Sequence, residues 1–123
     1  MKAYNVLVID DNRARCQGLA ELLTLQGFEA YAEFGGTEGI ARARSLRPDA
    51  VLLDLHMPDM DGVEVMTMLR DDPSMQSVAI ILLTAEGSPV STHGFDAFLT
   101  FPFETTTLTS VLLGCIMRRK QTK

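Results

Sequence analysis

The chain has 123 residues, of which 46% are hydrophobic and 22% are charged. This is the size and composition of one globular domain with a sizeable core, which excludes a disordered or multidomain protein. The formal net charge is -5 at pH 7, and residues 1–117 carry seven cations against 16 acids. Because a body this acidic offers no basic stripe, we expect no nucleic-acid binding.

The same sequence argues against membrane-bound and disulfide-rich proteins. No apolar run approaches the ~18 residues that span a membrane, and acidic residues stand where a signal peptide needs an apolar stretch. Cys16 and Cys115 form neither a disulfide framework nor a Cys-x-x-Cys zinc motif, and both fall on predicted inward faces. We therefore expect a cytoplasmic protein with no membrane partner, whose thiols are reduced and buried.

The first half of the chain alternates predicted strands with predicted helices. Residues 4–9 form a nearly unbroken apolar run, which is typical of a strand buried on both faces of a parallel sheet. Residues 13–26 carry an apolar stripe at helical spacing, and Gly27 can cap that helix. Residues 28–34 alternate in polarity, which indicates a strand nearer the edge. A second helix begins near Thr37 and must end before Pro48, and residues 50–55 form the third strand.

The second half continues the alternation, with one irregular connection. A short helix follows Gly62, and residues 78–83 form a fourth buried strand. Residues 85–96 contain two glycines and a proline, so a helix there has at most about one turn. Residues 97–101 form a fifth strand that stops at Pro102. Residues 104–117 carry the clearest helical stripe, and the basic residues after it suit the dipole of a helix end.

Strands alternating with helices are typical of a doubly wound α/β fold with right-handed crossovers. We therefore predict an α/β domain with a five-stranded parallel sheet, in which the fourth helix is short or absent. Ligands bind such sheets beyond the carboxyl ends of the strands, where the strand order reverses. The residues at those ends are therefore the first candidates for a functional site.

Carboxylates and a hydroxyl follow three of the predicted strands. Asp10 and Asp11 end the first strand, Asp54 lies at the end of the third, and Thr84 follows the fourth. Carboxylates brought within ~4–6 Å of one another raise each other's pKa unless a cation lies among them. A hard divalent ion with oxygen ligands, such as Mg2+, would resolve this conflict. Asp54 would also be placed as a nucleophile toward a phosphoryl group.

These residues resemble the receiver domain of two-component response regulators. Asp10 and Asp11 match the acidic pair of that family, and residues 54–62, with the sequence DLHMPDMDG, match its phosphoacceptor loop. Thr84 follows the acceptor at the usual interval of 30 residues, and Phe98 matches an aromatic residue that rotates on activation. The match covers nearly the whole chain. It implies the sheet order 2-1-3-4-5, one receiver domain over residues 1–123 without an output domain, and a cis bond before Pro102.

The resemblance also implies a role for each of these positions. Asp54 would accept a phosphoryl group from a histidine kinase or a histidine phosphotransfer protein. Asp11, Asp54 and the backbone carbonyl of His56 would bind Mg2+, with Asp10 assisting through water. Thr84 would hydrogen-bond a phosphoryl oxygen, and Phe98 would fill the space that the Thr84 loop leaves. The output partner is unknown, and a homodimer is one candidate assembly.

Two positions depart from the family pattern. Phe101 stands where the family has a lysine, and the lysines of this chain are residues 2, 120 and 123, near the termini. A phenyl ring cannot favour ionised carboxylates or pair with a phosphate, as an ammonium would. We therefore expect a stronger dependence on Mg2+ and weaker switching. The interval of 17 positions from Thr84 to Phe101 is also short, which predicts an altered partner surface. Arg13 is one candidate for a replacement cation.

Three functions are weighed on these residues. The first is phosphorelay signalling through Asp54. The second is an atypical receiver that binds proteins independently of phosphorylation. The third, remote alternative is a Mg2+-dependent phosphatase that forms an aspartyl phosphate. Such a phosphatase needs a second aspartate two residues after the nucleophile, where this chain has His56, so we expect no enzyme of this class.

Overall fold

The computed structural model describes residues 3–85 and 93–121. Five strands, all parallel, form one sheet: β1 (Asn5–Ile9), β2 (Glu29–Glu33), β3 (Ala50–Asp54), β4 (Ala79–Ala85) and β5 (Ala97–Phe101). Their order across the sheet is β2-β1-β3-β4-β5, as predicted. The helices are α1 (Arg13–Leu25), α2 (Gly36–Leu46), α3 (Gly62–Arg70) and α4 (Thr105–Gln121), with a short 3-10 turn at Pro73–Met75.

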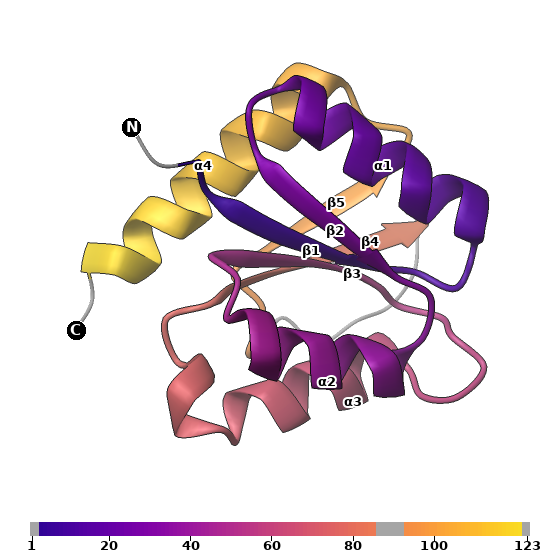
Figure 1. The fold of residues 1–123 in the computed structure, drawn as a ribbon, viewed down its shortest axis with the longest axis vertical. Coiled ribbons are helices and arrows are strands. Elements are labelled where there is room, and N and C mark those ends of the chain that lie inside the picture. The colour runs from indigo at the N-terminus through magenta and orange to yellow at the C-terminus, as the bar shows by residue number, and fades with distance from the viewer. Residues whose placement is uncertain (1–2, 86–92, 122–123) are drawn as a thin grey trace.

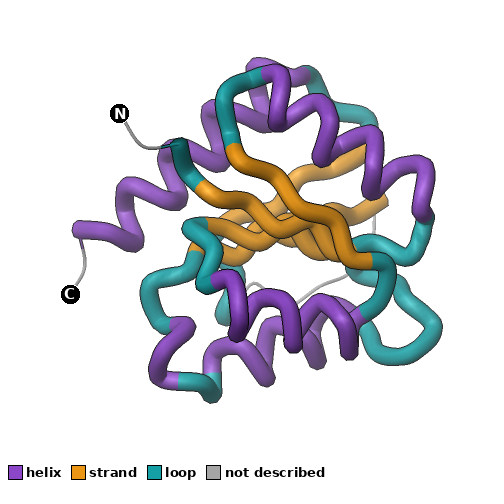
Figure 2. Tube along the Cα trace, viewed as in Figure 1, coloured by secondary structure: helices purple, strands orange, loops and turns teal. Residues whose placement is uncertain are grey.

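The sheet lies between two helical layers, which explains the apolar character of its central strands (Figures 1 and 2). Helices α1 and α4 cover one face, and α2 and α3 cover the other. Successive residues of β1 serve the two cores in turn: Val6 and Val8 pack with α1 and α4, while Leu7 and Ile9 pack with α2 and α3. Side chains alternate across a strand, so a strand covered on both faces needs apolar residues at every position.

The predicted element boundaries agree with the structure to within a few residues. Strand β2 pairs with β1 alone, so it is the edge strand that its alternating pattern indicated. Strand β4 continues to Ala85, because Ala85 pairs with Phe101 of β5. The helix that was expected to be short or missing is the one between the fourth and fifth strands, not the helix labelled α4. That expectation concerns mainly residues 86–92, which lie outside the described residues; residues 93–96 contain a turn and no helix.

The chain reverses its winding direction between β1 and β3. From β1 it crosses through α1 to β2, and from β2 it crosses back through α2 to β3 on the other side of β1. The carboxyl ends of β1 and β3 therefore flank the point at which ligands bind in open α/β sheets. Within the described residues, no helix combines the length and the apolar character that a membrane crossing requires.

Candidate functional site: an acidic hollow at the switch point

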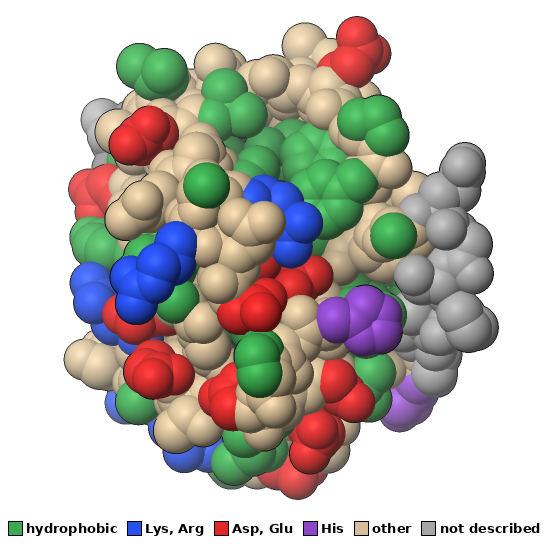
Figure 3. Space-filling view, turned by 90° about the vertical axis from the view of Figure 1, so that its right-hand side faces the viewer, with side chains coloured by type: hydrophobic (Ala, Val, Ile, Leu, Met, Phe, Trp, Pro, Cys, Tyr) green, Lys and Arg blue, Asp and Glu red, His purple; other side chains and the backbone are tan. Residues whose placement is uncertain are grey.

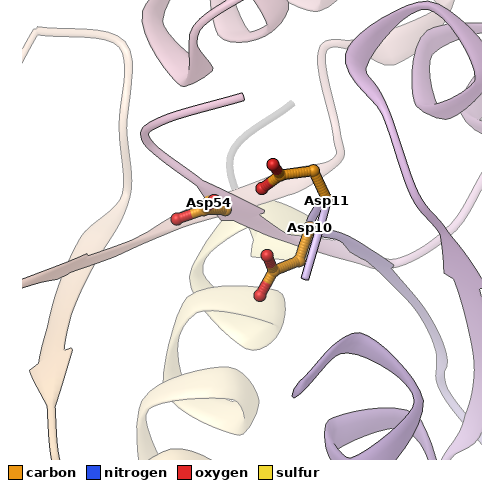
Figure 4. A group of neighbouring side chains, drawn as sticks. All are labelled: Asp10, Asp11 and Asp54. Atoms are coloured by element: carbon orange, nitrogen blue, oxygen red, sulfur yellow. The ribbon is translucent and has the colours of Figure 1, made fainter. Parts of the chain in front are cut away.

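Three carboxylates meet at the carboxyl ends of β1 and β3. Ile9 of β1 is aligned with Leu53 of β3, so the residues that follow them, Asp10 and Asp54, emerge side by side. One carboxylate oxygen from each of Asp10, Asp11 and Asp54 lies within 4.8 Å of the others (Figure 4). The structure thus brings together the three acids that the sequence placed at strand ends, and we call this group the acidic hollow.

Burial makes it unfavourable to keep the carboxylates of the acidic hollow ionised. Asp10 is fully buried, Asp54 is 7% exposed, and Asp11 is exposed. Burial raises the pKa of Asp54 from its usual value of 3.8 to about 6; the charges of Asp10 and Asp11 add to this rise, and that of Arg15 opposes it. A carboxylate with such a pKa is ionised at neutral pH but is poorly stabilised, so it needs a cationic partner.

The donor set of the hollow fits a hard divalent cation. Carboxylate oxygens are the ligands that Mg2+ prefers, and two of these three acids come from different strands held by the sheet. The imidazole of His56 is exposed and is not part of the cluster. The assignment of the His56 backbone carbonyl as a ligand stays a prediction.

A cation does lie in the hollow, and it is Arg15 rather than Arg13. The Nε and Nη2 atoms of Arg15 both donate to the carboxylate of Asp10, the second at 2.9 Å, and Nη2 lies 3.5 Å from Oδ2 of Asp54. The hydrogen bonds to Asp10 raise the pKa of Arg15. Arg13, the candidate that the sequence offered for a replacement cation, instead lies over the ring of Phe34, 4.2 Å from its centre.

Phe101, at the position of the missing lysine, is the neighbour of Arg15. The guanidinium carbon of Arg15 lies 4.8 Å from the centre of the Phe101 ring, which in turn packs against Phe103 at 5.2 Å between ring centres. Figure 3 shows one face of the molecule, on which a basic side chain lies between a group of hydrophobic side chains and a group of acidic side chains. Lys120, the one lysine among the described residues, pairs with Asp49 at 2.9 Å.

The two residues expected to act as a switch lie on neighbouring strands. Thr84 is buried on β4, one residue beyond the partner of Asp54, and its hydroxyl donates to the carbonyl of Ala85 at 2.7 Å. Phe98 on β5 packs edge-on against Phe95, with 5.6 Å between ring centres. It lies on the α2 and α3 face of the sheet, whereas Phe101 lies on the opposite face. Their roles in switching stay predictions.

The loop after Asp54 is attached to two helices. Asp59 accepts hydrogen bonds from the backbone N–H groups of Gly36 and Thr37 at the start of α2, which lowers its pKa to about 2. Asp61 forms a capping box with Glu64 at the start of α3. These contacts give a structural reason for two acids of the segment 54–62 that do not join the acidic hollow.

Sequence reasoning missed Arg15 because helical spacing could not separate it from Arg13. The two arginines are about 200° apart around the helix axis, so they flank the buried stripe of α1 on opposite sides. One signal was available: the first turn of α1 has two arginines and no acid, against the preference of a helix dipole. That arrangement indicates that acids from another element lie nearby, but only the sheet order shows which arginine reaches them.

Comparison with known proteins agrees with this geometry. Residues 6–112 match the family model of the response regulator receiver domain. The DNA-binding response regulator MtrA of Mycobacterium tuberculosis (strain ATCC 25618 / H37Rv) is 36% identical over 104 residues, which are 80% of this chain and 44% of MtrA. The polar-differentiation response regulator DivK of Brucella anthropi is 27% identical over 80% of this chain and 84% of DivK.

A solved structure shows the same fold. The Vibrio cholerae chemotaxis protein CheY4 superposes with a TM-score of 0.85 and 28% identity, covering 93% of this chain and 99% of CheY4. The chain spans less than half of MtrA but most of DivK and CheY4. The part that it shares with all three is the α/β domain that carries the acidic hollow.

Proposed function

Because the chain belongs to the response regulator receiver family, we propose that it acts in two-component signalling by accepting a phosphoryl group on Asp54. The observation that carries this proposal is the acidic hollow: a buried nucleophilic carboxylate with two further carboxylates on the adjacent strand end, all within reach of one cation. Receiver domains are signalling modules, and we propose one phosphorylation per chain rather than turnover of substrates.

The transfer step uses residues of this chain in defined roles. A carboxylate oxygen of Asp54 attacks the phosphorus of a phosphohistidine and forms a P–O bond. The P–N bond breaks, and its electron pair leaves with the imidazole of the partner. Asp10, Asp11 and Asp54 would hold Mg2+, which would offset the negative charge that develops on the phosphoryl oxygens. The Thr84 hydroxyl would exchange its bond to the Ala85 carbonyl for a bond to a phosphoryl oxygen.

We propose a histidine kinase or histidine phosphotransfer protein as the donor, with the domain acting in the cytoplasm. MtrA is named as a DNA-binding regulator, but this chain spans 44% of it. Since residues 1–117 carry seven cations against 16 acids, we propose that the receiver domain itself acts on protein partners. The absence of nucleic-acid binding stays a prediction.

Intact-mass measurement after incubation with acetyl phosphate and Mg2+ tests the proposal. We expect the wild-type chain to gain the mass of one phosphoryl group, and Asp54→Asn to gain none, because an amide lacks the nucleophilic oxygen. Chelation of Mg2+ with EDTA should abolish the gain. Labelling of Asp54→Asn at the wild-type level would contradict the assignment of the acceptor.

A second function is favoured by Phe101, which lies beside the hollow in place of an amine. An atypical receiver could bind its partner without phosphorylation. A wild-type chain that gains no phosphoryl group, together with partner binding that is the same for wild type and Asp54→Asn, would support this second function over the first.

A further inference from the structure

We propose that Arg15 is the resident cation of the acidic hollow and that the Phe101 ring positions it there; this inference rests on the proposed function. The guanidinium pairs with Asp10 through Nε and Nη2 and reaches Asp54 through Nη2. It thereby provides, from the first turn of α1, the positive charge that the family places at the end of the fifth strand. In this arrangement Arg15 and a divalent ion compete for the same carboxylates, while Arg15 also binds the phosphoryl oxygens on Asp54.

The geometry allows Arg15 to do both. Its side chain is 35% exposed, so solvent reaches Arg15 even while it pairs with the buried Asp10. The contacts to Asp10 and Asp54 use Nε and Nη2. A guanidinium has five N–H donors in a planar fork, which suits bidentate recognition of a phosphoryl group. A small rotation of the side chain would direct these donors from Asp10 toward an oxygen on the phosphorus.

Phe101 accounts for the position of the guanidinium. A cation over an aromatic face is attracted by the ring, and the planar guanidinium also stacks on it. The Phe101 ring is itself held by Phe103, with 5.2 Å between the ring centres. A phenyl group at position 101 thus stands where the family has a lysine, and it supplies a platform for the guanidinium of Arg15.

This arrangement predicts opposite effects on two measurements. Without Arg15, the three carboxylates keep their full negative charge, so Mg2+ binds more tightly. Without Arg15, the phosphoryl oxygens also lose a charge-assisted donor, so phosphorylation is slower. A residue that merely supported the fold would move both measurements in the same direction, because a disordered site binds and reacts less well.

The experiment compares Arg15→Ala with Arg13→Ala, which removes the same charge two residues away but leaves the hollow unchanged. Isothermal titration of the full chain with MgCl2 should show about tenfold tighter binding for Arg15→Ala than for Arg13→Ala. At saturating Mg2+, the rate of mass gain from acetyl phosphate should fall about tenfold or more in Arg15→Ala. Arg13→Ala should stay close to wild type in its phosphorylation rate.

Two further variants extend the test, and the first keeps it decisive if Arg15→Ala folds poorly. Phe101→Leu keeps Arg15 and removes only the aromatic platform. It should therefore also tighten Mg2+ binding and slow phosphorylation, each by a smaller factor than Arg15→Ala does. Phe101→Lys in the Arg15→Ala background returns an amine to the end of β5 and should restore most of the phosphorylation rate. Rescue by lysine is an effect that a purely structural role for Arg15 does not produce.

The inference is overturned if Arg15→Ala and Arg13→Ala have equal Mg2+ affinities and equal phosphorylation rates. It is also overturned if Arg15→Ala binds Mg2+ more weakly than Arg13→Ala. A wild-type chain that accepts no phosphoryl group would defeat the proposed function instead. In that case the Mg2+ titration still decides whether Arg15 compensates the charge of the hollow, since that measurement needs no phosphoryl donor.

Discussion

At the scale of single residues, the chain keeps an ionisable carboxyl group in a place that disfavours its charge. Asp54 is almost fully buried beside the buried Asp10, and its pKa is raised to about 6. An acid whose pKa is raised by folding holds its proton longer in the folded chain than in the unfolded chain. Folding stability therefore decreases as pH rises from about 4 to about 6, and the cost remains at higher pH. The burial of the Asp54 nucleophile therefore lowers the free energy of unfolding at neutral pH.

This cost predicts that Asp54→Asn stabilises the protein in EDTA at pH 8, by about 1–3 kcal/mol, because the amide removes a poorly compensated charge. At pH 4, where Asp54 is protonated, the two proteins should unfold at similar temperatures. Thermal unfolding at both pH values measures the difference. Equal unfolding temperatures at pH 8 would contradict the raised pKa of Asp54.

At the scale of elements, the position of Asp54 depends on how closely α3 approaches the end of β3. The N–H of Gly62 donates to the carbonyl of Leu55 at 2.7 Å, and a Cβ on Gly62 would lie 2.8 Å from the backbone oxygen of Asp54. Real Cβ atoms do not come this close to backbone, so any side chain at position 62 must displace α3 or the strand end. The glycine of the segment 54–62 is therefore required by packing.

We expect Gly62→Ala to lower both the unfolding temperature and the rate of phosphorylation by acetyl phosphate, because it shifts the backbone that carries Asp54. Gly18→Ala is the matched control: nothing lies within 4 Å of its added Cβ, on the exposed side of α1. Because alanine favours helix over glycine by about 1 kcal/mol, Gly18→Ala should raise the unfolding temperature. A Gly62→Ala protein with normal stability and labelling would refute the packing argument.

At the scale of the whole molecule, one carboxylate joins three elements at the end of the sheet opposite the acidic hollow. Asp96 accepts hydrogen bonds, each of 2.8 Å, from Arg70 of α3, Arg119 of α4 and the backbone N–H of Ile80 in β4. Arg70 also donates to the carbonyls of Val78 and Gly94. The basic residues near the end of the chain, which the sequence analysis associated with the helix dipole, thus include a link between α4 and the sheet.

Removal of this carboxylate should destabilise the whole domain rather than one element. Asp96→Ala leaves the mostly buried guanidinium of Arg70 without its ionic partner, which should cost about 2–4 kcal/mol in the free energy of unfolding. Glu21→Ala, at an exposed position on α1, is the control and should change it little. Urea unfolding followed by circular dichroism measures the free energy of unfolding of both variants. If Asp96→Ala loses no more of this free energy than Glu21→Ala, Asp96 has no such role.

Much of the architecture was accessible from local patterns. Continuous and alternating apolar runs located all five strands and their order in the chain, because burial on one or two faces of a sheet directly determines which positions must be apolar. The acids at the ends of β1 and β3 were also accessible, since parallel strands present their carboxyl ends at one edge. Helix α4 was underestimated by four residues at its end, because its last turn is polar and is held by ion pairs from other elements.

The sequence by itself determined that three carboxylates follow buried strands and that the end of the fifth strand has no lysine. Only the tertiary structure decided which cation meets those carboxylates. Arg13 and Arg15 are equivalent in local pattern, and they differ only in which strand end each faces: Arg13 meets Phe34 beyond β2, and Arg15 meets Asp10, Asp54 and Phe101. That difference follows from the order of strands across the sheet, which brings together residues far apart in the chain. The spacing of residues along a helix contains no information about that order.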